Sequence, residues 1–177
     1  MQGKPKRIAA LLTAILLISI VGILTEVGVL DPHRAYDYPV ERFSAEWADR
    51  IHQEENVEVC QIPAEELAGM SDVALIRSAA KFPFLVGFSA FDSVELGFDV
   101  AKSTSNAVAE LERRYLEAPG KFRWLLKNEI WRAECTQALD LRDDMTEGKG
   151  LDNATATLSL RQFAAALEKK AENLQKS

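Results

Sequence analysis

The sequence predicts an all-α protein, in which a compact domain of five to seven helices follows one N-terminal transmembrane helix. Three observations lead to this prediction. Apolar residues recur at spacings of three and four through most of the chain. Serine and proline stand where helices would begin and end,. Strand-like alternation is brief, and residues 57–62 are the only strand candidate,.

The first thirty residues predict a membrane span. Residues 1–7 hold three basic side chains, and no charged residue occurs from Ile8 to Leu24. With a second apolar patch, residues 8–30 reach the ~20 residues that cross the hydrocarbon of a bilayer. The basic residues orient residues 1–7 toward the cytoplasm and the C-terminal part outside the cell membrane.

An uncleaved anchor is favoured over a cleaved signal peptide for this span. Cleavage needs small residues in an A-x-A-like pattern, whereas residues 20–22 and 26–28 each place a large or charged residue there,. We therefore expect a single-pass membrane protein, or a secreted one if the segment is cleaved. A long buried helix is the alternative for the same apolar run.

The remainder of the chain predicts a tether and a helical domain. Residues 31–43 hold two prolines, two tyrosines and mixed charge, which is typical of an extended tether,. Residues 44–177 then form the extracytoplasmic helical domain. Its helices are expected at residues 45–55, 63–70, 72–81, from 93 onward, 105–118, 121–142 and 158–175,.

Local signals set several of these boundaries. Ser71 and Ser93 are predicted to cap the helices that follow them, and Pro83 to stop one,. Residues 121–142 are apolar over a broad arc that includes two tryptophans, which predicts a central helix with neighbours on several sides,. Residues 140–153 are predicted to form a polar loop.

The charge distribution argues against nucleic acid as a partner. The net charge is −6, and three of the 21 basic and one of the 27 acidic residues precede residue 31. The rest of the chain therefore carries −8 and shows no basic stripe,.

Cys60 and Cys135 predict a disulfide. Two cysteines in an oxidising compartment form a reasonable pair,. The bridge would close a loop of about 75 residues and stabilise the fold by ~4 kcal/mol in the chain-entropy model. Two buried thiols are the alternative.

Catalytic and metal motifs are weak, so no metal or cofactor is expected. Neither the histidines nor the cysteines have zinc-site spacing,. Ser78 and Lys81 spell S-x-x-K, about one helical turn apart, but the companion S-D-N and K-T-G elements are missing,. Glu65 and Glu66 are adjacent carboxylates at a predicted helix N-terminus, where both are stabilised as anions,.

One stretch of about fifty residues resembles a set of uncharacterised secreted or membrane-anchored helical proteins of Gram-positive bacteria. They share an I-P-x-x-x-L…M-S-T-x-x-L-I…Y-P pattern, then a Gly-Phe pair and E-L-x-x-R. The matching residues are Ile62-Pro63 with Leu67, Met70-Ser71, Leu75-Ile76, Phe82-Pro83-Phe84, Gly97-Phe98 and Glu110-Leu111 with Arg114. Asp72 stands where the usual threonine would be. The resemblance implies an extracytoplasmic helical domain and assigns no catalytic residue.

These observations predict a membrane-anchored, non-catalytic domain that binds a cell-envelope protein or peptide and is held in the lipid bilayer through residues 8–30. Exposed aromatics rimmed by polar groups are typical of interfaces, so Phe84, Phe88 and Phe91 are the candidate interaction surface,. Packing in the core is the alternative for these three. A small envelope hydrolase, based on Ser78 and Lys81 or on a carboxylate pair, is the alternative function.

Overall fold

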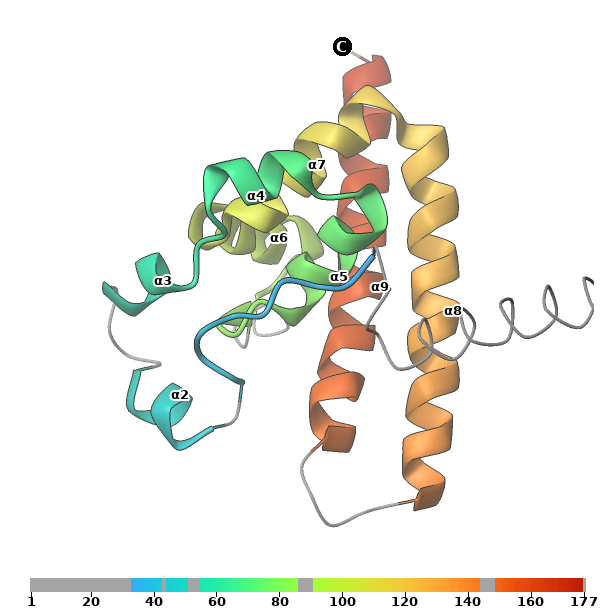
Figure 1. The fold of residues 1–177 in the computed structure, drawn as a ribbon. Coiled ribbons are helices and arrows are strands. Elements are labelled where there is room, and N and C mark those ends of the chain that lie inside the picture. The colour runs from blue at the N-terminus through green and yellow to red at the C-terminus, as the bar shows by residue number, and fades with distance from the viewer. Residues whose placement is uncertain (1–32, 43, 51–54, 86–90, 144–148, 177) are drawn as a thin grey trace, which may run out of the picture. The chain divides into compact units, whose positions relative to one another are not determined.

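The computed structural model describes residues 33–42, 44–50, 55–85, 91–143 and 149–176 (Figure 1). The chain divides into two compact units, residues 1–34 and 35–177, and the second holds the helical domain. The all-α prediction is confirmed, because the described residues form helices and no strand. The predicted span, residues 8–30, lies outside the described residues. None of the helices that are described combines the length and the apolar character needed to cross a membrane.

The helices of the domain follow the predicted order closely. They are α2 (Ala45–Arg50), α3 (Glu55–Val59), α4 (Ala64–Gly69), α5 (Asp72–Lys81), α6 (Val94–Thr104), α7 (Asn106–Glu117), α8 (Pro119–Asp143) and α9 (Lys149–Lys176). The strand candidate at residues 57–62 is wrong, because α3 covers its first half. The side chain of Gln61, two residues after α3, folds back onto this helix, and its Nε2 donates to the Val57 carbonyl at 2.7 Å.

Helix α5 packs against α7, α8 and α9, and six of its ten residues are buried. It buries mostly small side chains, which let its neighbours approach closely; they are Ala74, Leu75, Ile76, Ser78, Ala79 and Ala80. Residues 121–142 are predicted to have neighbours on several sides, and α8 does contact α5, α7 and α9. Helix α8 buries Phe122 and Leu126 and leaves its opposite side in solvent.

Helices α8 and α9 are the two longest and run side by side (Figure 1). Leu160, Phe163 and Leu167 of α9 are buried. The predicted polar loop at residues 140–153 is largely helical, since α8 extends to Asp143 and α9 begins at Lys149. That stretch contains no proline, so nothing in it forbids a helix,.

Residues 35–42, expected to belong to the tether, pack against α5. The Tyr36 amide donates to Ser78 Oγ at 2.8 Å, and the Tyr38 hydroxyl donates to the Ser78 carbonyl at 3.0 Å. Arg42, which is 6% exposed, donates to the carbonyls of Ala80 and Phe82 at 3.2 and 2.5 Å. The Ala80 carbonyl is in the last turn of α5, where carbonyls have no donor within the helix, and the Phe82 carbonyl just after it also accepts from the Leu85 amide at 3.4 Å,. The compact unit that holds the helices therefore begins at Ala35 and includes this segment.

Arg114 of α7 holds the corner between α4 and α5. Its guanidinium donates to the carbonyls of Leu67 and Met70, at 3.0 and 2.8 Å. It also donates to Asp72 Oδ1 at 3.0 Å and to Glu110 Oε1 at 2.7 Å. The side chain thus satisfies carbonyls at the end of one helix and pairs with an acid in the first turn of the next.

These ion pairs predict a loss of stability in acid. Hydrogen bonds from Arg113 and, despite partial burial, from Arg114 lower the pKa of Glu110 to about 2. Burial alone would raise the pKa of Asp72, but hydrogen bonds from Lys121 and Arg114 outweigh it and lower that pKa. A depressed folded-state pKa gives stability that is present above the unfolded pKa and is lost as the pH falls through the folded one.

We therefore expect the free energy of unfolding, measured by urea denaturation, to fall as the pH decreases from 4.5 toward 2,. The Glu110→Gln variant should show a smaller decrease over this range. An equal decrease in both proteins would contradict the role given to Glu110.

Candidate functional site

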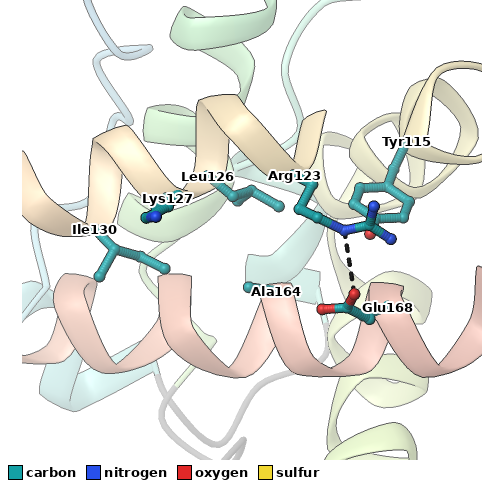
Figure 2. Close-up of a pocket in the computed structure, with 7 residues that line it drawn as sticks. All are labelled: Tyr115, Arg123, Leu126, Lys127, Ile130, Ala164 and Glu168. Atoms are coloured by element: carbon teal, nitrogen blue, oxygen red, sulfur yellow. Dashed lines mark ion pairs between the residues drawn. The ribbon is translucent and has the colours of Figure 1, made fainter. Parts of the chain in front are cut away.

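A groove among the described residues is formed by α7, α8 and α9 (Figure 2). Its volume is about 210 Å³, and it is lined by Tyr115, Arg123, Leu126, Lys127, Ile130, Ala164 and Glu168. The α8 residues recur at spacings of three and four, so one side of that helix forms one wall. Ala164 and Glu168, one turn apart on α9, form the other. We call this feature the α8–α9 groove.

The mouth of the groove is polar, and some of its charged side chains are paired with each other. Arg123 Nε lies 3.1 Å from Glu168 Oε1, as Figure 2 shows. Burial raises the pKa of Tyr115, an effect that nearby Arg123 reduces, so the hydroxyl stays protonated at neutral pH. Lys127 is exposed and makes no ion pair with the residues that the structure describes. The mouth therefore presents one cation that is not locally neutralised.

The floor of the groove is apolar, and its size limits what can occupy it. We call the apolar part of the two walls, Leu126, Ile130 and Ala164, the floor. At about 210 Å³ the groove is smaller than the roughly 300–1,000 Å³ of pockets for drug-sized ligands,. The groove has the size and chemistry to bind an apolar side chain of a ligand that also carries a carboxylate, which would lie beside Lys127. The groups around it provide no nucleophile paired with a base.

The predicted interaction surface is only partly assembled. Phe84 and Phe91 are half-buried and line a second hollow of about 80 Å³, together with Val100 and Thr104 of α6. Phe84 also packs edge-on against buried Phe82, with ring centres 5.9 Å apart. Phe88 lies outside the described residues. Two of the three aromatics therefore meet at the edge of the core rather than projecting from it.

Ser78 and Lys81 do not form a catalytic pair. Ser78 is fully buried, and its hydroxyl donates to the Ala74 carbonyl at 2.7 Å while accepting from the Tyr36 amide. Lys81 is exposed. The serine therefore links the segment before α2 to α5 and has no access to a substrate. Among the described residues, no group of three or more potential ligands is arranged to hold a metal ion.

The predicted disulfide is wrong. Cys60 and Cys135 lie far apart; Cys60 is fully buried beside the core, and Cys135 is exposed on α8. The prediction rested on compartment and on an even cysteine count, and neither contains information about distance.

Helix α8 has an exposed face that the sequence pattern does not indicate. Trp124 and Trp131 are 64% and 68% exposed, although the broad apolar arc of residues 121–142 predicts contacts on several sides. We call the exposed stripe to which they belong the tryptophan face; its residues are Trp124, Asn128, Trp131, Cys135 and Ala138. Their alternating spacings of four and three mark one side of a helix, separate from the side that holds Phe122 and Leu126.

The different burial of the two cysteines can be tested by thiol titration under reducing-agent-free conditions. We expect Cys135 to react in the native protein and Cys60 only after unfolding in guanidinium, because reagents reach only exposed thiols,. Cys135→Ser should abolish the native reaction. A wild-type protein with no reactive thiol, native or unfolded, would show that the disulfide forms.

Comparison of the chain with protein-family models, with curated proteins and with solved structures gave no match. The resemblance to proteins of Gram-positive bacteria therefore stays a prediction from the residues quoted above.

Proposed function

We propose that the protein is a membrane-anchored, non-catalytic domain that binds a cell-envelope protein or peptide outside the membrane. The observation that carries this proposal is the α8–α9 groove, with an apolar floor and a cation at its mouth. The proposed partner segment places an apolar side chain on Leu126 and Ile130 and a carboxylate beside Lys127.

The energetics of this contact favour recognition of a short segment. Burying one Leu- or Val-sized side chain contributes about 1.5–3 kcal/mol, and an exposed ion pair adds about 0.2–1 kcal/mol. These terms are too small for tight binding by themselves. The groove would therefore select the segment, and contacts beyond it would add affinity.

The predicted location fits an envelope partner. Residues 1–7 would lie in the cytoplasm, residues 8–30 in the bilayer and the domain outside the cell membrane. The alternative of a small envelope enzyme has weaker support, because the Ser78 hydroxyl is enclosed by Tyr36 and Ala74. Glu65 and Glu66, the carboxylate candidates, are both exposed in the first turn of α4.

Crosslinking at the surface of native cells, with pull-down of the full-length protein and mass spectrometry, tests the proposal. We expect one specific envelope partner, whose recovery falls about tenfold in Lys127→Glu, equivalent to ~1.4 kcal/mol. Lys81→Glu is the matched control, because it makes the same charge change on an exposed lysine of α5, away from the groove.

Recovery of the same partner at equal yield from all three proteins would show that the groove is not the contact. Recovery of no partner from folded, membrane-bound protein would contradict the proposed function as a whole.

A further inference from the structure

The α8–α9 groove contains a buried hydroxyl that donates to none of the described residues. Tyr115 of α7 lines the groove and is 1% exposed, and its ring packs against Phe122 with ring centres 6.3 Å apart. No hydrogen bond among the described residues has the Tyr115 hydroxyl as its donor. Arg123, the basic side chain beside it, has only donors and cannot accept the proton,. Because buried polar groups are normally hydrogen-bonded, this hydroxyl indicates that an acceptor binds in the groove.

One end of the groove is closed by an ion pair. Arg123 of α8 and Glu168 of α9 pair at 3.1 Å and join the two walls at the end where Tyr115 lies, opposite Ile130 (Figure 2). Glu168 is the only carboxylate among the described residues that line the groove, and this pair neutralises it. A bound chain that continued in this direction would have to pass the pair, whereas a chain that ends in the groove would not.

We propose that the α8–α9 groove binds the C-terminal residue of its partner, with a leucine, isoleucine or valine side chain on the floor and the free α-carboxylate held by Lys127 and the Tyr115 hydroxyl. This inference rests on the proposed function and specifies which part of the partner the groove recognises. The closed end favours a chain terminus, and two further features favour it over an internal segment.

The first feature is the small size of the groove. At about 210 Å³ it must take the apolar side chain and the carboxylate side by side. In an extended segment, neighbouring side chains point to opposite sides, and alternate ones stand ~7 Å apart along the chain. An acidic side chain within such a segment therefore fits poorly beside an apolar one in this space. At a C-terminus both groups are attached to the same Cα atom, which keeps them together.

The second feature is the match of charge and donors. Lys127 is exposed and has no ion pair among the described residues, whereas Arg123 is already paired with Glu168. A bound carboxylate would supply the missing negative charge. It has two oxygens that accept several hydrogen bonds, so it can accept from the Lys127 ammonium and from the Tyr115 hydroxyl together. A peptide carbonyl would satisfy the hydroxyl but would leave the ammonium without a counter-charge.

NMR titration of the full-length protein with short peptides tests the proposal. The probes are acetyl-Gly-Gly-Leu with a free carboxylate, the same peptide as its C-terminal amide, and acetyl-Gly-Gly-Ser with a free carboxylate. We expect the leucine acid to bind at millimolar concentrations. The amide should bind about tenfold more weakly because it lacks the charge, and the serine acid about tenfold more weakly because it lacks the apolar side chain.

Two variants assign the contacts. Lys127→Met removes the charge and keeps an aliphatic stem, so the leucine acid and its amide should bind equally. Lys81→Met makes the same change on an exposed lysine of α5 and should leave the preference for the acid unchanged. Tyr115→Phe should weaken binding of the leucine acid about fivefold. Its midpoint of urea denaturation should match that of the wild type, because the ring is kept and the hydroxyl donates to no described residue.

Equal binding of the leucine acid and its amide by the wild type, or no binding of the acid, would overturn the inference. The proposed function would stand in either case if the crosslinked partner still depends on Lys127, because that experiment is independent of which part of the partner is bound. Unchanged affinity in Tyr115→Phe, or a lower midpoint of urea denaturation, would overturn the role given to the hydroxyl.

Discussion

The helical domain depends on the way Arg114 closes the corner between α4 and α5. Arg114 donates to the carbonyl of Leu67 in α4 and to that of Met70, the residue that follows this helix, while pairing with Asp72 at the start of α5. Because α5 contacts α7, α8 and α9, fixing its start helps to orient the elements that build the groove. Leu67, Met70 and Arg114 also belong to the stretch that resembles the Gram-positive proteins. Their positions here indicate a role in the fold rather than in chemistry.

Much of the fold could be predicted because its signals are local. Ser71 and Ser93 cap α5 and α6 as expected, accepting from the amides of Ala74 and Leu96 at 3.2 and 3.1 Å. The packing of residues 35–42 could not be predicted in the same way. Its hydrogen bonds join residues about forty positions apart, and a segment with two tyrosines and mixed charge has no periodicity to indicate them.

The candidate sites were harder to predict because they depend on which side of a helix is buried. The groove joins three helices, so no short motif marks it. The tryptophans and Leu126 all belong to one broad apolar arc, and only the position of α9 beside α8 shows that the arc covers two sides. Cys135 falls on the exposed side, which is why a disulfide with buried Cys60 is excluded. The sequence shows that these side chains are apolar or thiols, but whether each is buried or exposed depends on how the helices pack.

A double-mutant cycle between Arg114 and Asp72 tests the central claim most directly. Urea denaturation of Arg114→Met, Asp72→Asn and the double variant should give a coupling free energy of at least about 1 kcal/mol. The control pair, Arg113 and Glu117, has side chains that are 55% and 63% exposed, so it should give a coupling of about 0.5 kcal/mol or less,. A coupling between Arg114 and Asp72 no larger than that of the control would contradict the view that Arg114 holds this corner of the domain.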